Sequence, residues 1–172
     1  MSRGLYIFVE GDDDKRFFSY LRDKILNSKY EYIEIPTYAG EKKSRIKSYI
    51  SSIESMNSKY IFVADKDNFA NIEQKKEKIA EIYKIASSNI EIVVVEIESW
   101  YIAGLNDEEL KKRKIKLKNN TTEYITKEIF DKFVKDDIRT SYMMDIIDSY
   151  DIEIAKTRNE SFKNFYHKYL IL

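Results

Sequence analysis

Acidic side chains follow three short apolar stretches of this sequence, and carboxylates of this kind could hold a metal ion. They are Glu10, Asp65, Asp67, Glu96 and Glu98. Carboxylate oxygens are the ligands of hard divalent cations such as Mg²⁺ and Mn²⁺, which proteins commonly share with substrate phosphates. The chain has no cysteine and one histidine, which excludes disulfides, thiolate zinc sites and a histidine-rich centre. The residue types therefore predict a Mg²⁺ or Mn²⁺ site suited to phosphoryl chemistry.

Strands are predicted directly before these acids. Four stretches rich in β-branched and aromatic residues predict strands over residues 5–9, 32–35, 60–64 and 90–95. Apolar residues at helical spacing lie between them, so we expect an α/β fold whose mostly parallel four-stranded sheet is flanked by helices. In such sheets the ligand binds at the carboxyl ends of the strands, where the strand order reverses.

The strand order decides which acids meet. With the order 2-1-3-4, the first and third strands are neighbours, and Glu10, Asp65 and Asp67 would face one another. Glu96 or Glu98 would then stand one strand further along. Gly11 allows a sharp turn into the first helix, which Asp13 or Asp14 could cap.

The sequence after residue 104 predicts helices and no further strand. The expected helices are 107–113, 122–134, 142–150 and 160–170, with a capping signal at Thr121 and Thr122 after the loop residues Asn119 and Asn120. We therefore expect an α/β domain over residues 1–104 and an α-helical C-terminal extension over 105–172, packed on the same domain.

Composition narrows the class of protein. With 172 residues, 43% hydrophobic and 35% charged, the chain is typical of a globular protein. Apolar runs are only a few residues long, so we expect no membrane span and no secretory signal, and a cytoplasmic protein. The formal net charge is zero, so binding to nucleic acid would need a local basic patch.

Basic residues lie at the predicted starts of two helices, where exposed N–H groups favour phosphate. The candidate substrate-binding residues are Lys15, Arg16, Lys42, Lys43 and Arg45.

The roles of several other residues are less specific. The run KKRKIKLK at 111–118 could follow a nucleic-acid backbone or could form a solvated face. Tyr38 could stack on a base. Phe162, Phe165 and Tyr169 fit a packing face, and the role of Arg158 stays open.

The acidic motifs resemble those of the Toprim domain, which is found in topoisomerases, bacterial primases, RecR-type repair proteins and OLD-type nucleases. In that family a glutamate follows the first strand in a V-E-G-x-x-D context, and a D-x-D follows the third. The matching residues are Val9, Glu10, Gly11, Asp14, Asp65 and Asp67. Residues 95–104 and 158–166 are also similar to small stand-alone Toprim-like proteins, several of which accompany phage-defence systems.

The resemblance implies a Toprim-like (Rossmann-like) fold and Mg²⁺-dependent phosphodiester hydrolysis of DNA or RNA, in phage defence or nucleic-acid repair. It implies Glu10 as a general acid or base and Asp65 and Asp67 as metal ligands. One ion would lie on Glu10 and Asp65, and a second could use Asp67 with Glu96 or Glu98. The chain departs from the family at residues 68–71, where a further acid is common and NFAN stands here.

Three alternatives compete with the nuclease. One is a non-catalytic Toprim-like module that binds nucleic acid or a protein partner in a defence or repair assembly. Another is a haloacid-dehalogenase-like phosphatase, because IFVADKDNF (61–69) fits the D-x-D of that class, although those enzymes carry it on their first strand. The third is an acidic loop cluster without chemistry, since a fold does not guarantee activity.

Overall fold

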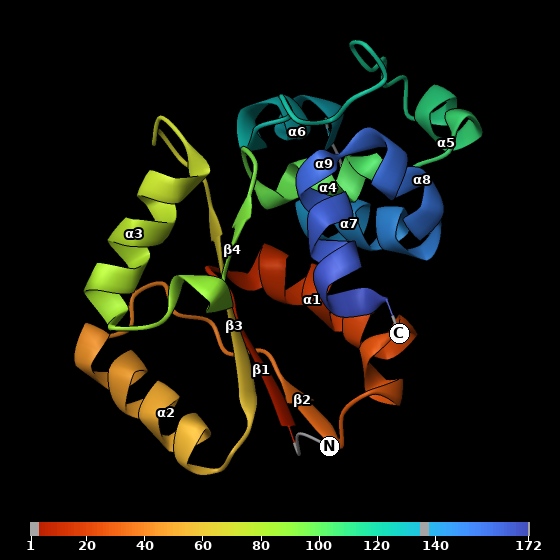
Figure 1. The fold of residues 1–172 in the computed structure, drawn as a ribbon. Helices are drawn as coiled ribbons and strands as arrows, with labels where there is room; N and C mark the ends of the chain where they lie inside the picture. The colour runs from red at the N-terminus through yellow and green to blue at the C-terminus, as the bar shows by residue number, and fades with distance from the viewer. Residues whose placement is uncertain (1–3, 135–137, 172) are drawn as a thin grey trace. The chain divides into compact units, whose positions relative to one another are not determined.

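The computed structural model describes residues 4–134 and 138–171 and shows an α/β protein with a four-stranded parallel sheet (Figure 1). The chain divides into two compact units, residues 1–92 and 93–172. The strands are β1 (Gly4–Phe8), β2 (Tyr32–Glu34), β3 (Lys59–Asp65) and β4 (Ile90–Val93). Their order is β2-β1-β3-β4, which confirms the predicted fold class and the order 2-1-3-4.

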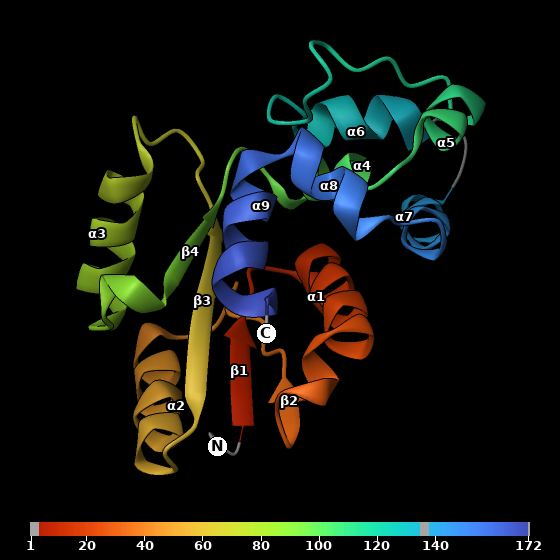
Figure 2. The ribbon, with the colours of Figure 1, turned by 45° about the vertical axis from the view of Figure 1, so that its right-hand side comes forward.

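Helices cover both faces of the sheet within the first unit. They are α1 (Asp12–Lys24), α2 (Lys43–Ser55) and α3 (Ile72–Tyr83). In Figure 2, α1 lies on one side of the sheet, and α2 and α3 lie on the other. Every residue of β1 is buried, as expected for a parallel strand covered on both faces.

The core of the first unit follows the two-residue period of the strands. Tyr6 and Phe8 of β1 pack with Tyr60 and Phe62 of β3 in one cluster, to which α2 and α3 add isoleucines. The rings of Phe8 and Phe62 stack with their centroids 5.8 Å apart. Aromatic side chains on one face of β1 and β3 therefore pack together in the core of the first unit.

The second unit is helical after Val93. Its helices are α4 (Ile97–Ala103), α5 (Asp107–Lys112), α6 (Lys127–Val134), α7 (Arg139–Asp148), α8 (Ile152–Arg158), α9 (Glu160–Phe165) and a π-helical turn (Tyr166–Leu170). Among the described residues no strand follows β4, as predicted. The helix α8 was not foreseen.

The predicted start of the helix at residue 122 is wrong, because α6 begins at Lys127. Thr122 donates its N–H to the carbonyl of Arg158 at 3.0 Å and is fully buried, so it is held in a loop. The hydroxyl of Thr126 accepts the N–H of Ile129 at 3.4 Å and caps the helix instead.

A buried polar network ties α4 to α9. Trp100 packs against Phe162 and Phe165, and its indole N–H donates to the Ser161 hydroxyl at 2.8 Å. The two phenylalanines are buried, as predicted for a packing face, and Trp100 packs against them. At the end of α4, a Cβ on Gly104 would meet the Tyr150 ring at 2.4 Å, so only glycine fits.

Candidate functional site

Glu10 and Asp65 lie at the carboxyl ends of two neighbouring parallel strands. Tyr6 to Phe8 of β1 pair in register with Tyr60 to Phe62 of β3. Continued by two residues, this register brings Glu10 level with Ala64, next to Asp65. Glu10 is exposed and Asp65 is half-buried, so both lie at the rim of the sheet.

The loop after β2 runs beside the end of β1 and places Tyr38 there. The N–H of Tyr38 donates to the carbonyl of Val9 at 2.9 Å, and the N–H of Ala39 donates to the carbonyl of Glu10 at 3.2 Å. The Tyr38 hydroxyl donates to the carbonyl of Val63 at 3.1 Å. The phenol therefore bridges the ends of β1 and β3.

Negative charge converges on this phenol. Burial raises the pKa of the Tyr38 hydroxyl above its ordinary value of 10.0 and is the largest cause of the shift. Three carboxylates raise the pKa of Tyr38 further: Glu10, Asp14 and Asp65. The pKa of Tyr83 is also raised, first by burial and then by the charge of Glu10. The phenol of Tyr38 is thus held neutral among three acids.

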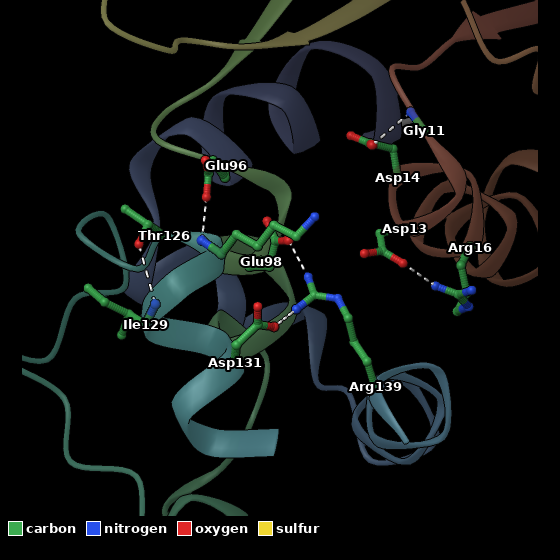
Figure 3. A network of polar contacts seen from close by, with 11 residues as sticks. Gly11, Asp13, Asp14, Arg16, Glu96, Glu98, Thr126, Ile129, Asp131 and Arg139 are labelled. Carbon is green, nitrogen blue, oxygen red and sulfur yellow. Dashed lines mark hydrogen bonds and ion pairs between the residues drawn. The ribbon is translucent and has the colours of Figure 1, made fainter. Parts of the chain in front are cut away.

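Asp14 is positioned by the start of α1. Its carboxylate accepts the N–H of Gly11 at 3.1 Å and is 7% exposed, which confirms its predicted role at the helix start (Figure 3). Asp13 instead pairs with Arg16 at 2.7 Å. Of the three aspartates at the start of α1, Asp14 is the one whose charge acts on Tyr38.

The two acids of the D-x-D have different surroundings. Asp67 is exposed, has a left-handed backbone with φ 50°, and forms an ion pair with Lys75. The ammonium of Lys75 also lies 5.1 Å from the centroid of the Phe69 ring. Asp67 is not among the charges that raise the pKa of Tyr38, and its carboxylate has Lys75 as a partner.

Glu96 and Glu98 belong to the second unit, where each has a protein partner. The side chain of Glu96 accepts the backbone N–H of Lys127, the first residue of α6 (Figure 3). Glu98 is 4% exposed and forms an ion pair with Arg139. Val95 before them has φ 71°, a rare conformation for a β-branched residue, at the turn between β4 and α4.

Arg139 joins two acids in the same unit. Its guanidinium binds Glu98 and also Asp131 of α6, and lies 4.9 Å from the centroid of the Phe130 ring (Figure 3). A buried carboxylate requires such compensation, because an uncompensated charge away from water is costly. Arg139 was not foreseen as the partner of Glu98.

The predicted basic residues lie at two helix starts. Lys15 is exposed, and Arg16 binds Asp13. Lys42 is the N-cap residue of α2 and caps no N–H with its side chain, and Lys43 is the first residue of that helix.

Arg45, in the first turn of α2, pairs with Glu41 at 2.9 Å. Lysines 15, 42 and 43 are therefore the basic side chains most open to a phosphate.

Glu10 and Asp65 have the donor chemistry of a magnesium or manganese site. Within residues 4–134 and 138–171, no group of three or more histidine, cysteine, aspartate or glutamate side chains is arranged to hold a metal ion. Mg²⁺ commonly binds through one or two carboxylates, with water and substrate phosphates as its other ligands. The pair fits an ion shared with a phosphate better than one enclosed by protein.

In comparisons with known proteins, no family model matches the chain, and neither the curated proteins nor the solved structures contain a match. None of the described helices has the length and apolar character needed to cross a membrane.

Two members of the site escaped sequence reasoning. Tyr38 was considered for base stacking, but its ring stacks on Phe62 with centroids 4.4 Å apart. Asp14 was predicted as a possible helix cap and as part of the V-E-G-x-x-D match, but not as a member of the metal site. The V-E-G-x-x-D match was the sequence signal that could have placed Asp14 near the site. No local sequence pattern indicates that Arg139 is the partner of Glu98.

Proposed function

We propose that this protein is a Mg²⁺- or Mn²⁺-dependent nuclease that hydrolyses phosphodiester bonds in DNA or RNA. The observation that carries the proposal is the position of Glu10 and Asp65 at the carboxyl ends of the neighbouring parallel strands β1 and β3, with Asp14 held at the start of α1 by the Gly11 N–H. Ligand sites of open α/β sheets lie at this edge. The Toprim-like motifs at the same residues support the same chemistry.

Each residue of the site has a role in this proposal. Glu10 and Asp65 would hold the ion, which would neutralise charge at the phosphoryl oxygens and lower the pKa of a bound water. Glu10, the exposed member, accepts the proton of the attacking water. Asp14, fixed by the Gly11 N–H, adds negative charge that favours a cation there. Tyr38 stays protonated and keeps the ends of β1 and β3 together through Val63.

Substrate phosphates bind at the starts of α1 and α2 in this proposal. The contacting residues are Lys15, Arg16, Lys42, Lys43 and Arg45, of which both arginines can exchange an exposed or half-exposed carboxylate partner for a phosphate. We place the activity in cytoplasmic phage defence or nucleic-acid repair, with a protein partner, on the resemblance alone.

Substitution of each D-x-D aspartate tests the proposal. Cleavage of labelled DNA and RNA is measured in Mg²⁺ or Mn²⁺ for Asp65→Ala and Asp67→Ala. We expect Asp65→Ala to lose metal-dependent cleavage by a factor of about 10³ or more. Asp67→Ala removes a carboxylate that already has Lys75 as partner, so it should retain more activity than Asp65→Ala. Full cleavage by a folded Asp65→Ala variant would remove Asp65 from the mechanism.

A second candidate is a non-catalytic module that binds nucleic acid or protein. It is favoured by the protein partners of Asp67, Glu96 and Glu98, which would have to be displaced before these acids could hold a second ion. This candidate predicts binding that survives EDTA and is lost when Lys42, Lys43 or Arg45 is replaced.

A further inference from the structure

The basic run at residues 111–118 forms an exposed row of ammonium groups in the second unit. We call Lys111, Lys114, Lys116 and Lys118 the lysine row; all four are exposed. From Lys114 to Lys118 exposure alternates, since Ile115 is buried and Leu117 is half-buried. Lys111 lies in the last turn of α5 and Lys114 has a left-handed backbone with φ 58°, whereas the two-residue alternation of the non-helical residues 115–118 puts Lys116 and Lys118 on one side, about 6–7 Å apart.

The row borders a recess with an apolar floor. Three of its lysines, with Leu110 and Ile115, line a cavity of about 410 Å³. The one carboxylate in the lining is Asp107, which pairs with Arg158 at 2.6 Å. Among the described residues, no carboxylate lies within ion-pair distance of Lys111, Lys114 or Lys116, so this recess carries net positive charge.

Arg158 holds both ends of the segment that carries the row. It is 6% exposed, binds Asp107 before the segment, and donates to the side-chain oxygen of Asn120 after it at 3.2 Å. Asn119 and Asn120 have φ 51° and 54°, as a type I′ turn requires, and close a tight turn between Lys118 and Thr121. The row is thus presented by an ordered segment, which lowers the entropy lost on binding.

An aromatic ring lies at the end of the row. Lys118 donates its backbone N–H to the Tyr124 hydroxyl at 3.1 Å, and its ammonium lies 5.2 Å from the centroid of the Tyr124 ring. Tyr124 is half-buried. A row of cations ending at an aromatic side chain is typical of surfaces that bind single-stranded nucleic acid.

We propose that the lysine row binds the phosphate backbone of single-stranded nucleic acid, with Tyr124 stacking on a base. The choice of ligand rests on the nuclease function proposed above, and the lysine row would add a substrate contact in the second unit. Binding to an anionic membrane is less well supported, because Leu110 and Ile115 of the recess are buried and Leu117 is half-buried, so no fully exposed apolar side chain of residues 110–118 is offered to lipid.

The test measures binding in EDTA, so that its result does not depend on cleavage. Fluorescence anisotropy follows a labelled oligothymidylate longer than the roughly 4–16 nucleotides that such surfaces cover. The test variant carries Lys111→Gln, Lys114→Gln, Lys116→Gln and Lys118→Gln. The matched control carries the same change at four other exposed lysines: Lys59, Lys84, Lys132 and Lys168.

Counterion release sets the expected size of the effect. Each lost phosphate contact on a single strand lowers the slope of log K against log salt by about 0.7, so the test variant should lose about 3. At about 0.1 M salt this corresponds to roughly fivefold in affinity for each lysine and several hundredfold for the row. Tyr124→Ala should weaken binding on the order of tenfold. The control variant, and a variant with arginine at all four row positions, should bind nearly as the wild type does.

Several results would overturn the proposal. One is a control variant that loses as much affinity as the test variant, and another is a folded test variant whose slope of log K against log salt is unchanged. Tighter binding of duplex than of single strand, or binding only to vesicles of anionic lipid, would also overturn it. Melting temperature verifies that each variant is folded. A protein that binds through the row but never cleaves would support this inference while refuting the nuclease function.

Discussion

Replacing Asn159 by alanine should destabilise the second unit far more than removal of an ordinary helix cap. Asn159 is 1% exposed and precedes α9. Its side-chain oxygen accepts the N–H of Phe162 at 2.9 Å and the hydroxyl of Ser161 at 2.8 Å. Its amide nitrogen donates to the hydroxyls of Thr122 at 3.1 Å and Ser99 at 3.3 Å. One side chain therefore joins α4, the loop before α6 and α9.

The expected loss is the sum of two terms. The capping interaction contributes about 1 kcal/mol. Leaving buried partners such as the Phe162 N–H and the Ser161 hydroxyl without their acceptor costs a further 1–3 kcal/mol, approximately, for each group not rescued by water. We expect about 3–5 kcal/mol in total, a large part of the 5–15 kcal/mol or so by which a typical domain is stable.

Asn106 provides the matched control. It also caps a helix, since its side chain accepts the N–H of Glu109 at 2.8 Å, but it is exposed. Asn106→Ala should cost only about 1 kcal/mol. Urea unfolding of both variants can be followed by the fluorescence of Trp100, the one tryptophan of the chain, which packs on Phe162.

The comparison refutes the reasoning if the two variants lose the same stability to within about 1 kcal/mol. That result would mean that water or a rearrangement satisfies the groups around Asn159, and that the network does not hold α4 to α9.

Two further predictions concern charge. For Tyr38→Phe, the sign of the effect follows from the raised pKa of the phenol. The folded protein keeps the phenol protonated while the unfolded chain ionises above about pH 10, so this group lowers wild-type stability by about 1.4 kcal/mol per pH unit. In urea unfolding from about pH 10 to 12, the stability of the variant should therefore fall less steeply, by that amount. A wild-type slope equal to that of the variant would contradict the burial of this phenol. For Arg139→Gln, loss of the ion pair to the buried Glu98 should cost about 2–3 kcal/mol of stability. This is less than for a fully enclosed pair, because Arg139 is 24% exposed. Adding Glu98→Gln should recover most of the lost stability. A double-mutant cycle with zero coupling would show that the pair contributes nothing.

The sheet and the meeting of Glu10 with Asp65 could be predicted from sequence because both depend on local pattern. Apolar runs identify the strands, and neighbouring parallel strands end at the same edge. Glu10 and Asp65 therefore lie at the same edge of the sheet, whereas Asp67, two residues beyond, pairs with Lys75.

The partners of the other acids could not be predicted, because they depend on contacts between distant segments. The carboxylate of Glu98 meets Arg139 from a separate helix, and Tyr38 reaches the site through a loop that pairs with the end of β1. Contacts of this kind produce no periodic pattern in the sequence, so they cannot be predicted from it. The start of α6 was mispredicted for the same reason, since Thr122 binds the carbonyl of Arg158 rather than capping the helix.

The most direct test of the central claim is a cleavage assay of the purified protein on single- and double-stranded DNA and RNA, with Mg²⁺, Mn²⁺ or EDTA, beside Glu10→Gln. Glu10 is exposed, so its amide variant should fold normally. We predict cleavage that requires the metal ion and is lost in Glu10→Gln. Metal-independent cleavage, cleavage unchanged in that variant, or no cleavage of any substrate together with no metal-induced rise in melting temperature, would contradict the account.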